Sequence, residues 1–392
     1  MITALQIIFW VSVFLVVYTY IGYGFILFLM VKIKRMLGWS DVIPEKPTEF
    51  PEVTFVVAAY NEQDWIVDKI NNTLDLEYPK DKIKYFFVTD GSNDRTPEII
   101  QQYPQIKLFH RPERAGKIAA VERIMEFVET PIVIYTDANT MVNKEAIYNI
   151  VRHYENPKVG AVAGEKRISM DAEDAANAAG EGIYWKYESS LKRWDSELYS
   201  VVGAAGELFS LRTEMYEAVP KDTIIEDFYM TLRIAQKGYK VRYEPNAYAV
   251  EGPSASVKEE LKRKIRIAAG GIQAIVRLAP LLNIFKYGML TFQYVSHRVL
   301  RWTLAPLVLP LILATNIALA VSTGGMYLAI LMLQVLFYAF AAMGYVFEQK
   351  KIKVKAFFVP YYFCIMNYAV YRGFMRNWAG SQSVMWEKAK RA

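Results

Sequence analysis

Cysteine and histidine are almost missing from this chain of 392 residues. It contains one cysteine, Cys364, and three histidines, His110, His153 and His297, which lie far apart in the sequence. A single cysteine excludes an internal disulfide framework and a zinc site built from cysteines. Three scattered histidines argue against a histidine-rich metal centre.

Two widespread nucleotide-binding motifs are also absent. Neither a P-loop nor a G-x-G-x-x-G fingerprint follows the first strand-like run at 53–59. Both motifs use a glycine-rich turn to bring backbone N–H groups to phosphates. Ordinary NTPase and dinucleotide-binding functions are therefore weak hypotheses for this chain.

The N-terminus lacks the features of a cleaved signal peptide. Its first residues, MITALQ, include no basic residue, and no small-residue cleavage site follows. Residues 4–31 carry no charge, and this uncharged stretch is long enough to form a helix that crosses a bilayer. Lys32, Lys34 and Arg35 come next, and basic flanks stay on the cytoplasmic side. We therefore expect an uncleaved anchor with a cytoplasmic basic end.

The composition indicates a polar domain between membrane segments. The chain is 53% hydrophobic and 22% charged, with a mean hydropathy of +0.11. We expect further spans at 301–322 and 326–347, whereas 356–375 is interrupted by Pro360, Asn367 and Arg372 and is expected to be re-entrant or surface-lying. The expected regions are an anchor at 1–35, a cytosolic domain at 48–257, membrane-surface helices at 258–298, transmembrane or re-entrant segments at 299–378 and a tail at 379–392.

Basic residues set the expected orientation. Lysines cluster at 350–355, after the expected span at 326–347, whereas the loop at 321–325 carries no charge. We therefore predict a multi-pass protein of the cell (inner) membrane with its large domain in the cytoplasm. The net charge of +6 suits nucleic acid, anionic lipid or phosphate-bearing substrates equally well.

The polar domain alternates strand-like and helix-like segments. This alternation predicts an α/β fold with a mostly parallel sheet covered on both faces. Ligands of such sheets bind outside the carboxyl ends of the strands. The strand-like segments are 53–59, 85–88, 106–109, 132–135 and 160–163, and the helix-like segments are 62–76, 96–103, 116–128 and 144–155.

Acidic residues follow three of these strands. Glu62 follows the first strand, Asp90 the second and Asp137 the fourth, with Asn139 two residues later. One explanation is local, since Asp and Asn are good turn residues and Glu favours the start of a helix. The other is a shared site, because oxygens at i and i+2 can bind one hard cation. Their convergence on one edge of the sheet favours the site.

Seven motifs together resemble the family 2 glycosyltransferases. The resemblance covers about 53–280 and is to the membrane-embedded branch that includes cellulose, hyaluronan and poly-N-acetylglucosamine synthases. It implies a Rossmann-like glycosyltransferase-A (GT-A) domain in the cytosol, joined to α-helical transmembrane segments. The motifs are VVAAYNE (56–62), TDGSND (89–94), RAGKIAAVE (114–122), YTDAN (135–139), GAAGELFSLR (203–212), IIEDFYMTLRIAQKGYK (224–240) and RKIRIAAGG (263–271).

The resemblance implies a binding site for a nucleotide-diphosphate sugar, in particular a UDP-hexose or UDP-N-acetylhexosamine. Tyr60, Glu62 and Asp90 match family positions that line the nucleobase pocket. Lys117 matches a lysine that contacts the diphosphate, although a lysine there is otherwise read as a solvated residue on a helix face.

The resemblance also implies a bound Mg²⁺ or Mn²⁺. The D-x-D motif of the family matches Asp137-Ala138-Asn139, so Asp137 and Asn139 are the expected ligands. Asn139 departs from the family pattern, and a neutral amide predicts weaker or water-mediated binding. The ion would neutralise the diphosphate and stabilise the leaving group.

Asp227 matches the general base of the family, and Glu226 beside it shapes the site. The base would take the proton of the acceptor hydroxyl during an inverting transfer. The local alternative is that both acids merely begin a helix at 228–238, where they favour the helix dipole. Arg263 and Arg266 fall in the motif that reads Q-x-x-R-W in processive members, and Arg266 would clamp the diphosphate.

Ile267 replaces the tryptophan of that motif, which stacks on the acceptor sugar in processive synthases. Its absence predicts a single addition or a short product. Other aromatic residues lie elsewhere. Those of the helix-like stretch 174–198 fit either packing or sugar binding, whereas three later tryptophans are interpreted as anchors at the membrane interface. The first set is Tyr184, Trp185, Tyr187 and Trp194, and the second is Trp302, Trp378 and Trp386.

The predicted function is a membrane-bound inverting glycosyltransferase for cell-surface or exopolysaccharide synthesis. Its predicted partners are the sugar donor, a polysaccharide, oligosaccharide or lipid-linked acceptor, and the bilayer, but not nucleic acid; a second copy of the chain and an export partner stay open. The alternatives are a processive polysaccharide synthase and a membrane receptor that binds a nucleotide without turnover. A transporter is less favoured, because 301–347 contains one charged residue, Arg301.

Overall fold

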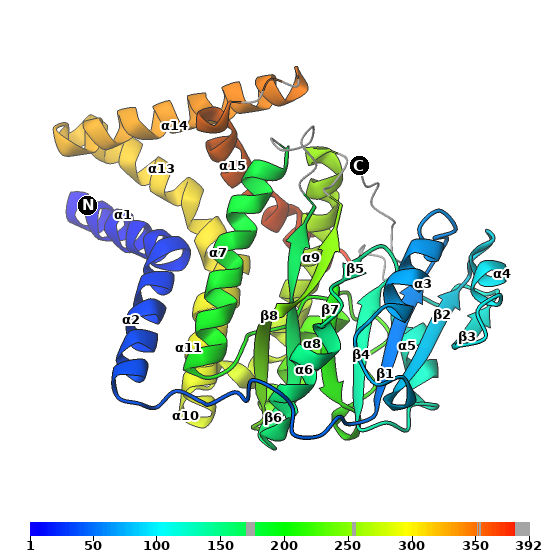
Figure 1. Cartoon of the computed structure of the whole chain (residues 1–392). Coiled ribbons are helices and arrows are strands. Elements are labelled where there is room, and N and C mark those ends of the chain that lie inside the picture. The colour runs from blue at the N-terminus through cyan, green and yellow to red at the C-terminus, as the bar shows by residue number, and fades with distance from the viewer. Residues whose placement is uncertain (170–176, 253–255, 351, 353, 381–392) are drawn as a thin grey trace.

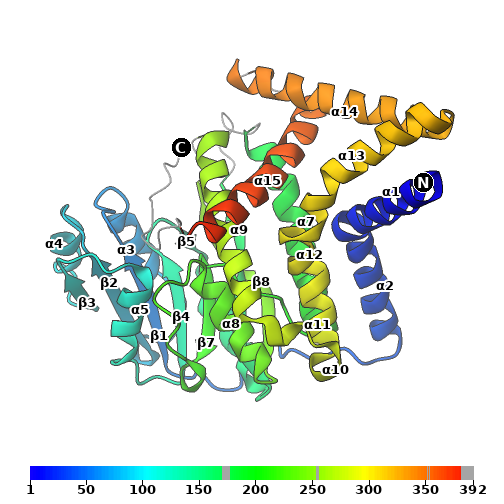
Figure 2. The same cartoon turned by 180° about the vertical axis from the view of Figure 1, so that it is seen from behind.

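The computed structural model describes residues 1–169, 177–252, 256–350, 352 and 354–380. They form an α/β domain around one sheet and a group of long helices beside it (Figure 1). Figure 2 shows from behind that the apolar helices project away from the sheet.

The domain is centred on an eight-stranded sheet. Its strands are β1 (Val53–Ala59), β2 (Ile83–Asp90), β3 (Ile106–Arg111), β4 (Ile132–Asp137), β5 (Met141–Val142), β6 (Val159–Ile168), β7 (Leu208–Arg212) and β8 (Lys240–Glu251). Their order in space is β3-β2-β1-β4-β7-β6-β8-β5. Strands β1 to β4 pair in parallel, whereas β7 is antiparallel to both β4 and β6. The predicted α/β fold is confirmed, with parallel pairs among the first four strands and between β6 and β8.

Helices connect these strands where helical periodicity predicts them, but they are shorter than expected. They are α3 (Ile66–Leu74), α4 (Thr96–Ile100), α5 (Lys117–Met125), α6 (Ala146–Val151) and α8 (Glu226–Gln236). Short 3₁₀ turns lie at Lys80–Lys82, Arg152–Glu155, Thr213–Met215 and Ala279–Leu282. Helix α3 begins at Ile66, and Asn61 in the segment before it has a left-handed conformation with φ of 53°.

Apolar side chains pack on both faces of the sheet. Val56 and Val133 belong to the cluster on the face covered by α5 and α8. Phe55 and Ile134 belong to the cluster on the other face, with α3 and α6. Successive strand residues point to opposite faces, so strands covered on both faces read as continuous apolar runs. Both faces are therefore occupied by core packing, and the strand ends are left for a ligand.

Three helices of the described residues are long and apolar enough to cross a membrane. The first, Ile2–Met36, consists of α1 (Ile2–Val17), a π-helical turn (Tyr18–Gly22) and α2 (Tyr23–Met36). The others are α13 (Leu304–Thr323) and α14 (Met326–Gln349). Figure 1 shows that the first helix changes direction between α1 and α2, and π-helical turns are a known cause of such bends.

Helix α2 packs against the α/β domain through α7 (Asn177–Leu198). Tyr23 and Leu27 of α2 are fully buried in one cluster with Leu191 of α7. At the end of α2, the Nζ atom of Lys34 donates a hydrogen bond to the carbonyl oxygen of Glu197 at 2.7 Å. The basic end of the predicted anchor is therefore bound to the domain.

The remaining helices lie between the sheet and the candidate spans. They are α9 (Val257–Arg277), α10 (Ile284–Tyr287), α11 (Met289–Tyr294), α12 (Leu300–Trp302) and α15 (Lys355–Trp378), with a π-helical turn at Val295–Val299. Helix α15 continues through Pro360 and packs along α9 and α14. The segment 356–375, expected to be re-entrant or surface-lying, is thus part of one continuous helix, and its place relative to the membrane stays a prediction.

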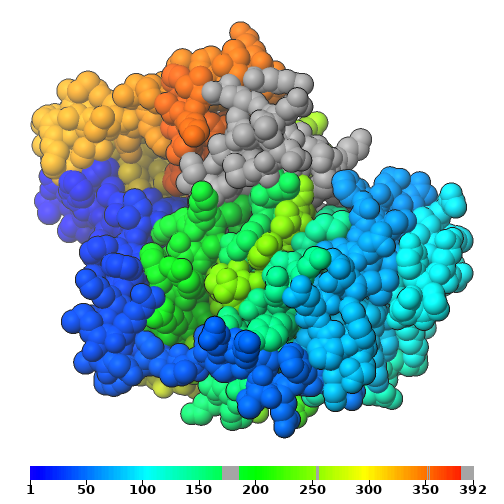
Figure 3. Space-filling model, in the orientation of Figure 1, coloured from blue at the N-terminus to red at the C-terminus, as the bar shows by residue number. Residues whose placement is uncertain are grey.

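Residues 37–52 connect α2 to β1 along the outside of the domain (Figure 3). Asp41 forms ion pairs with Lys240 at 3.1 Å and with Arg242, both on β8. The hydroxyl of Thr48 donates a hydrogen bond to Glu155 at 2.6 Å. The connection is therefore held against the domain by polar contacts.

Candidate active site

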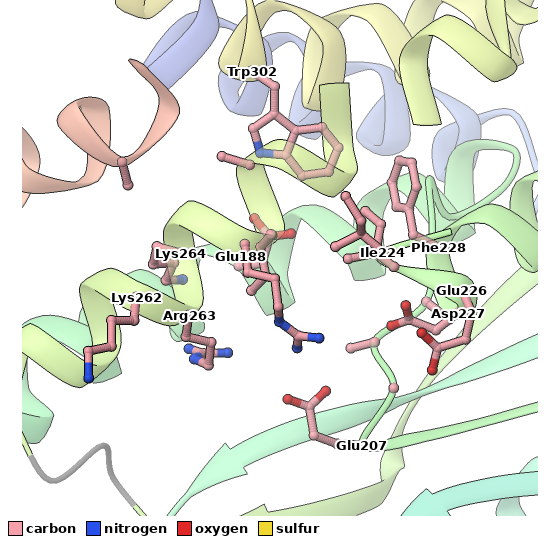
Figure 4. Close-up of a pocket in the computed structure, with 18 of the residues that line it drawn as sticks. Glu188, Glu207, Ile224, Glu226, Asp227, Phe228, Lys262, Arg263, Lys264 and Trp302 are labelled. Atoms are coloured by element: carbon pink, nitrogen blue, oxygen red, sulfur yellow. The ribbon is translucent and has the colours of Figure 1, made fainter. Parts of the chain in front are cut away.

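A cavity of about 560 Å³ lies at the carboxyl ends of the parallel strands. Its wall includes the segments after β1, β3 and β4, the segment before β7, the start of α8, and parts of α7, α9, α12 and α15. All predicted site residues except Asp90 line it. Figure 4 shows Glu207, Glu226 and Asp227 at the end near the sheet and Trp302 on the other side. The cavity therefore extends from the sheet to the membrane helices.

Lys117 lies between two carboxylates of the candidate site, those of Asp137 and Glu226. It begins α5 directly after Gly116, whose φ of 98° favours glycine. Its Nζ atom lies 2.8 Å from Oδ1 of Asp137 and 3.0 Å from Oε1 of Glu226. Burial works against the charge, but these two carboxylates outweigh it and raise the pKa of Lys117. Lys117 therefore stays charged at neutral pH, as binding of a diphosphate requires.

Asp137 and Asn139 fit the predicted metal site. Strand β4 ends at Asp137, and burial raises the pKa of its carboxyl group against the effect of Lys117. The Oδ1 atom of Asn139 is buried and accepts no hydrogen bond from the described residues. A buried oxygen without a partner is costly, so it is suited to an external ligand. The described residues contain no group of three or more His, Cys, Asp or Glu that could hold a metal, so phosphate and water oxygens would complete the shell.

Lys69 is a buried residue that the sequence reasoning missed. Its Nζ atom donates hydrogen bonds to the carbonyl oxygen of Thr140 at 2.7 Å and to the hydroxyl of Thr136 at 3.2 Å. These residues flank the Asp137–Asn139 turn, so Lys69 holds both ends of it. Burial lowers the pKa of Lys69 to about 7, against the effect of Asp137. The sequence feature that could have indicated its burial is its position next to Ile70 on the apolar face of α3.

Glu226 and Asp227 begin α8 and differ in their electrostatics. Burial first, and then the charge of Glu226, raise the pKa of Asp227 to about 7 despite Lys117. Burial would also raise the pKa of Glu226, but Lys117 outweighs it and lowers that pKa. A Cβ atom at Gly206 would lie 3.4 Å from Oδ2 of Asp227, so the glycine keeps space beside this carboxylate. A carboxylate with a pKa near neutrality suits a general base.

The predicted nucleobase residues are placed differently from one another. The guanidinium of Arg114 lies 3.9 Å from the ring centroid of Tyr60, which lines the cavity. Oδ2 of Asp90 instead accepts hydrogen bonds from the N–H groups of Ala115 and Gly116, at 2.8 and 2.6 Å. Asp90 therefore shapes the loop before α5 through Oδ2, while its Oδ1 atom is buried and accepts no hydrogen bond from the described residues. Its contact with the nucleobase stays a prediction.

The basic motif lies on α9. Arg263 and Arg266 both line the cavity, and Arg263 pairs with Glu260 one turn earlier at 2.8 Å. Burial lowers the pKa of Arg266, while Glu226 opposes that shift. Glu207 also lines the cavity and was not among the predicted site residues. Its place within the motif at 203–212 could have indicated a position near the site.

Trp302, interpreted from the sequence as an interface anchor, packs against other side chains of the protein. Its ring meets that of Phe228 edge-on, with centroids 5.2 Å apart, and lines the cavity. Trp302 lies just before α13, and its ring packs toward α8. Trp378 at the end of α15 is 82% exposed, and Trp386 lies outside the described residues.

The aromatic residues of α7 divide between the two expected roles. Trp185 and Tyr187 line the cavity. Trp194 packs against Phe28 of α2, with ring centroids 5.4 Å apart. The side chain of Tyr184 is outside the described part of the structure.

The architecture is similar to that of a solved glycosyltransferase. A mannosyltransferase from Pyrobaculum calidifontis, solved in complex with GDP-mannose and Mn²⁺, has a TM-score of 0.71 and 22% identity, over 96% of this chain and 100% of that one. The fold is that of the GT-A class of glycosyltransferases. Residues 54–219 match the glycosyl transferase family 2 model.

Two relatives are polysaccharide synthases. The poly-β-1,6-N-acetyl-D-glucosamine synthase of Staphylococcus aureus (strain MSSA476) is 29% identical over 240 residues, which are 58% of this chain and 57% of the synthase. That of Staphylococcus epidermidis is 24% identical over 279 residues, or 68% and 65% of the two chains. The chain thus spans less than two thirds of the length of either synthase. The predicted resemblance to family 2 and the predicted fold are confirmed, whereas the roles of single residues stay predictions.

Proposed function

We propose that the chain is a membrane-bound inverting glycosyltransferase that uses a nucleotide-diphosphate sugar and a divalent cation. The observation that supports this function most is that one cavity brings Asp137 and Asn139 together with Asp227. The first two residues offer oxygen ligands, and Asp227 offers a base with a pKa of about 7. Lys117 lies between them and adds charge for the diphosphate.

In the proposed reaction, Asp227 takes the proton of an acceptor hydroxyl. The hydroxyl oxygen forms a bond to the anomeric carbon of the donor sugar, while the bond from that carbon to the diphosphate oxygen breaks on the opposite face. The nucleoside diphosphate leaves, and the anomeric configuration inverts. When bound to Asp137 and Asn139, Mg²⁺ or Mn²⁺ supplies positive charge that stabilises this leaving group. Lys117 and Arg266 contribute charge from the protein.

The acceptor is proposed to be a glycan or a lipid-linked glycan that enters from the membrane side. The cavity continues to Val359, Phe363 and Val370 of α15, which offer an apolar surface. An amphipathic acceptor would place its sugar near the carboxylates and its apolar part against this helix. Ile267 supports a single addition, whereas processive synthesis is the second candidate because of the synthases among the relatives.

The domain is proposed to face the cytoplasm of a cell with the chain in its inner membrane. Lys34 and Arg35 at the end of α2 and the lysine cluster at 350–355 support this orientation. A protease added outside intact cells should leave residues 48–257 uncut, and cleavage there would contradict the orientation.

The proposed activity is tested with the purified full chain in nanodiscs and a panel of UDP-glucose, UDP-N-acetylglucosamine and GDP-mannose. Release of a nucleoside diphosphate from one donor is expected with Mn²⁺ or Mg²⁺ and should stop when EDTA is added. Transfer products should show inverted anomeric configuration by NMR. Donor binding without release from any donor would favour the receptor alternative, and neither binding nor release would contradict the proposal.

A further inference from the structure

We propose that Trp302 is the platform of a subsite for the acceptor sugar, placed by Gly271 and Phe228 on the membrane side of the carboxylates. The ligand class is a hexopyranose unit of a glycan. This inference rests on the proposed function for the nature of the acceptor, but the subsite itself follows from the contacts of the indole ring.

The ring of Trp302 is fixed by neighbours and still lines the cavity. The Phe228 ring meets it edge-on, at an interplanar angle of 65°, and the guanidinium of Arg298 lies 5.7 Å from its centroid. The side chain is partly exposed and belongs to the cavity wall. Figure 4 shows the indole on the far side of the cavity from Glu207. A rigid aromatic surface is thus offered to a ligand at low conformational cost.

Gly271 lets the indole lie against α9. A Cβ atom at this position would come within 2.7 Å of Cζ3 of Trp302, which is closer than side chains approach one another. Glycine destabilises the interior of a helix relative to alanine, and Gly271 lies well inside α9. The close approach of Trp302 is the structural reason for a glycine here.

The backbone around Trp302 is irregular. A π-helical turn at Val295–Val299 precedes α12, and Thr303 leaves the helical region with φ of −132° and ψ of −93°. Such interruptions of a helix are frequent at functional sites. Here the break separates Trp302 from the apolar helix α13, and its ring packs on Phe228 of α8.

The surroundings of the ring match the chemistry of a sugar. A pyranose presents C–H groups on one face, which an aromatic ring binds, and hydroxyl groups around its rim, which carboxylates and guanidinium groups bind. Phe228, which contacts Trp302, directly follows Asp227 in the chain. A sugar resting on Trp302 therefore has a carboxylate within the same cavity to receive a rim hydroxyl.

The test measures binding without turnover. The full chain in nanodiscs, with Mn²⁺ and either UDP or GDP, is titrated with radiolabelled methyl cellobioside, methyl mannobioside and diacetylchitobiose by equilibrium dialysis. Trp302→Leu fills space but removes the aromatic face, and Gly271→Ala displaces the ring while favouring the helix. Trp378→Ala is the matched control, because Trp378 is 82% exposed at the end of α15.

At least one disaccharide is expected to bind wild type, and both Trp302→Leu and Gly271→Ala should weaken it about tenfold, with nucleotide affinity unchanged. Trp378→Ala should bind like wild type. Wild-type affinity in Trp302→Leu, or no binding of any probe to wild type, would overturn the subsite. Tryptophan-dependent disaccharide binding in a chain that releases nucleotide from no donor would instead refute the proposed function and leave the subsite standing.

Discussion

The two ends of the cavity are built in different ways. The donor end gathers charged and polar groups, such as Lys117, Asp137 and Asn139, that follow parallel strands or begin the next helix. The end proposed for the acceptor combines aromatic and apolar side chains on separate helices, such as Trp302 on α12 and Ile267 on α9, with the guanidinium groups of Arg298 and Arg301. If the two ends bind donor and acceptor as proposed, donor binding depends on individual charges, whereas acceptor binding depends on how helices pack.

Asp227 lies where the two ends meet. Its carboxylate is near Lys117 on the donor side, since both approach Gly206, and the next residue, Phe228, contacts Trp302 on the acceptor side. Substitutions at the donor end should therefore change nucleotide and metal affinity, and substitutions at the acceptor end should leave both unchanged.

The largest effect is expected for Asp137→Ala. It removes the carboxylate ligand and leaves Asn139 as the remaining predicted protein ligand. Even groups outside the ligand shell contribute about 10- to 100-fold to metal affinity, so this loss should exceed 100-fold. Metal-dependent donor binding by calorimetry measures it, with Asp75→Ala, which pairs with Lys144 at the surface, as control. Unchanged metal dependence would place the cation elsewhere.

The pH dependence of kcat/KM should report Asp227. Burial and Glu226 raise its pKa to about 7, and a general base acts in its ionised form. The rate should therefore rise about tenfold per pH unit below 7 and level off above it. A flat profile between pH 5 and 8, at saturating metal, would show that another group accepts the proton.

A smaller effect is expected for Lys69→Met. The change removes the two hydrogen bonds that hold the Asp137–Asn139 turn, each worth about 1 kcal/mol, so donor affinity should fall roughly tenfold. Thermal stability should change little, because burying methionine is less costly than burying an ammonium group. Lys80→Met is the control, since Lys80 also donates to two carbonyl oxygens but lies away from the cavity. Equal donor affinities of the Lys69→Met and Lys80→Met variants would show that Lys69 does not support the donor site.

The residues at the proposed donor end could be predicted from the sequence, because residues that come directly after parallel strands lie close together in the folded domain. Glu62 comes after β1, and Asp137 is the last residue of β4. These neighbouring strands are parallel, so they end at the same edge of the sheet. Lys69 could not be predicted in the same way, since most lysines on helices are exposed. Trp302 depends on the contact between α9 and α12, which no local pattern encodes. Asp90 shows the converse, a motif residue that the fold uses to hold a loop.

The most direct measurement is the behaviour of Asp227→Asn, because the change keeps the shape of the side chain and removes its basicity. The variant should fold, bind donor as wild type does, and turn over about 10²- to 10⁴-fold more slowly. Donor affinity, melting temperature and rate are measured on the same preparation. A stable variant that binds donor and turns over within a few-fold of wild type would make Asp227 a helix-start residue and contradict the mechanism.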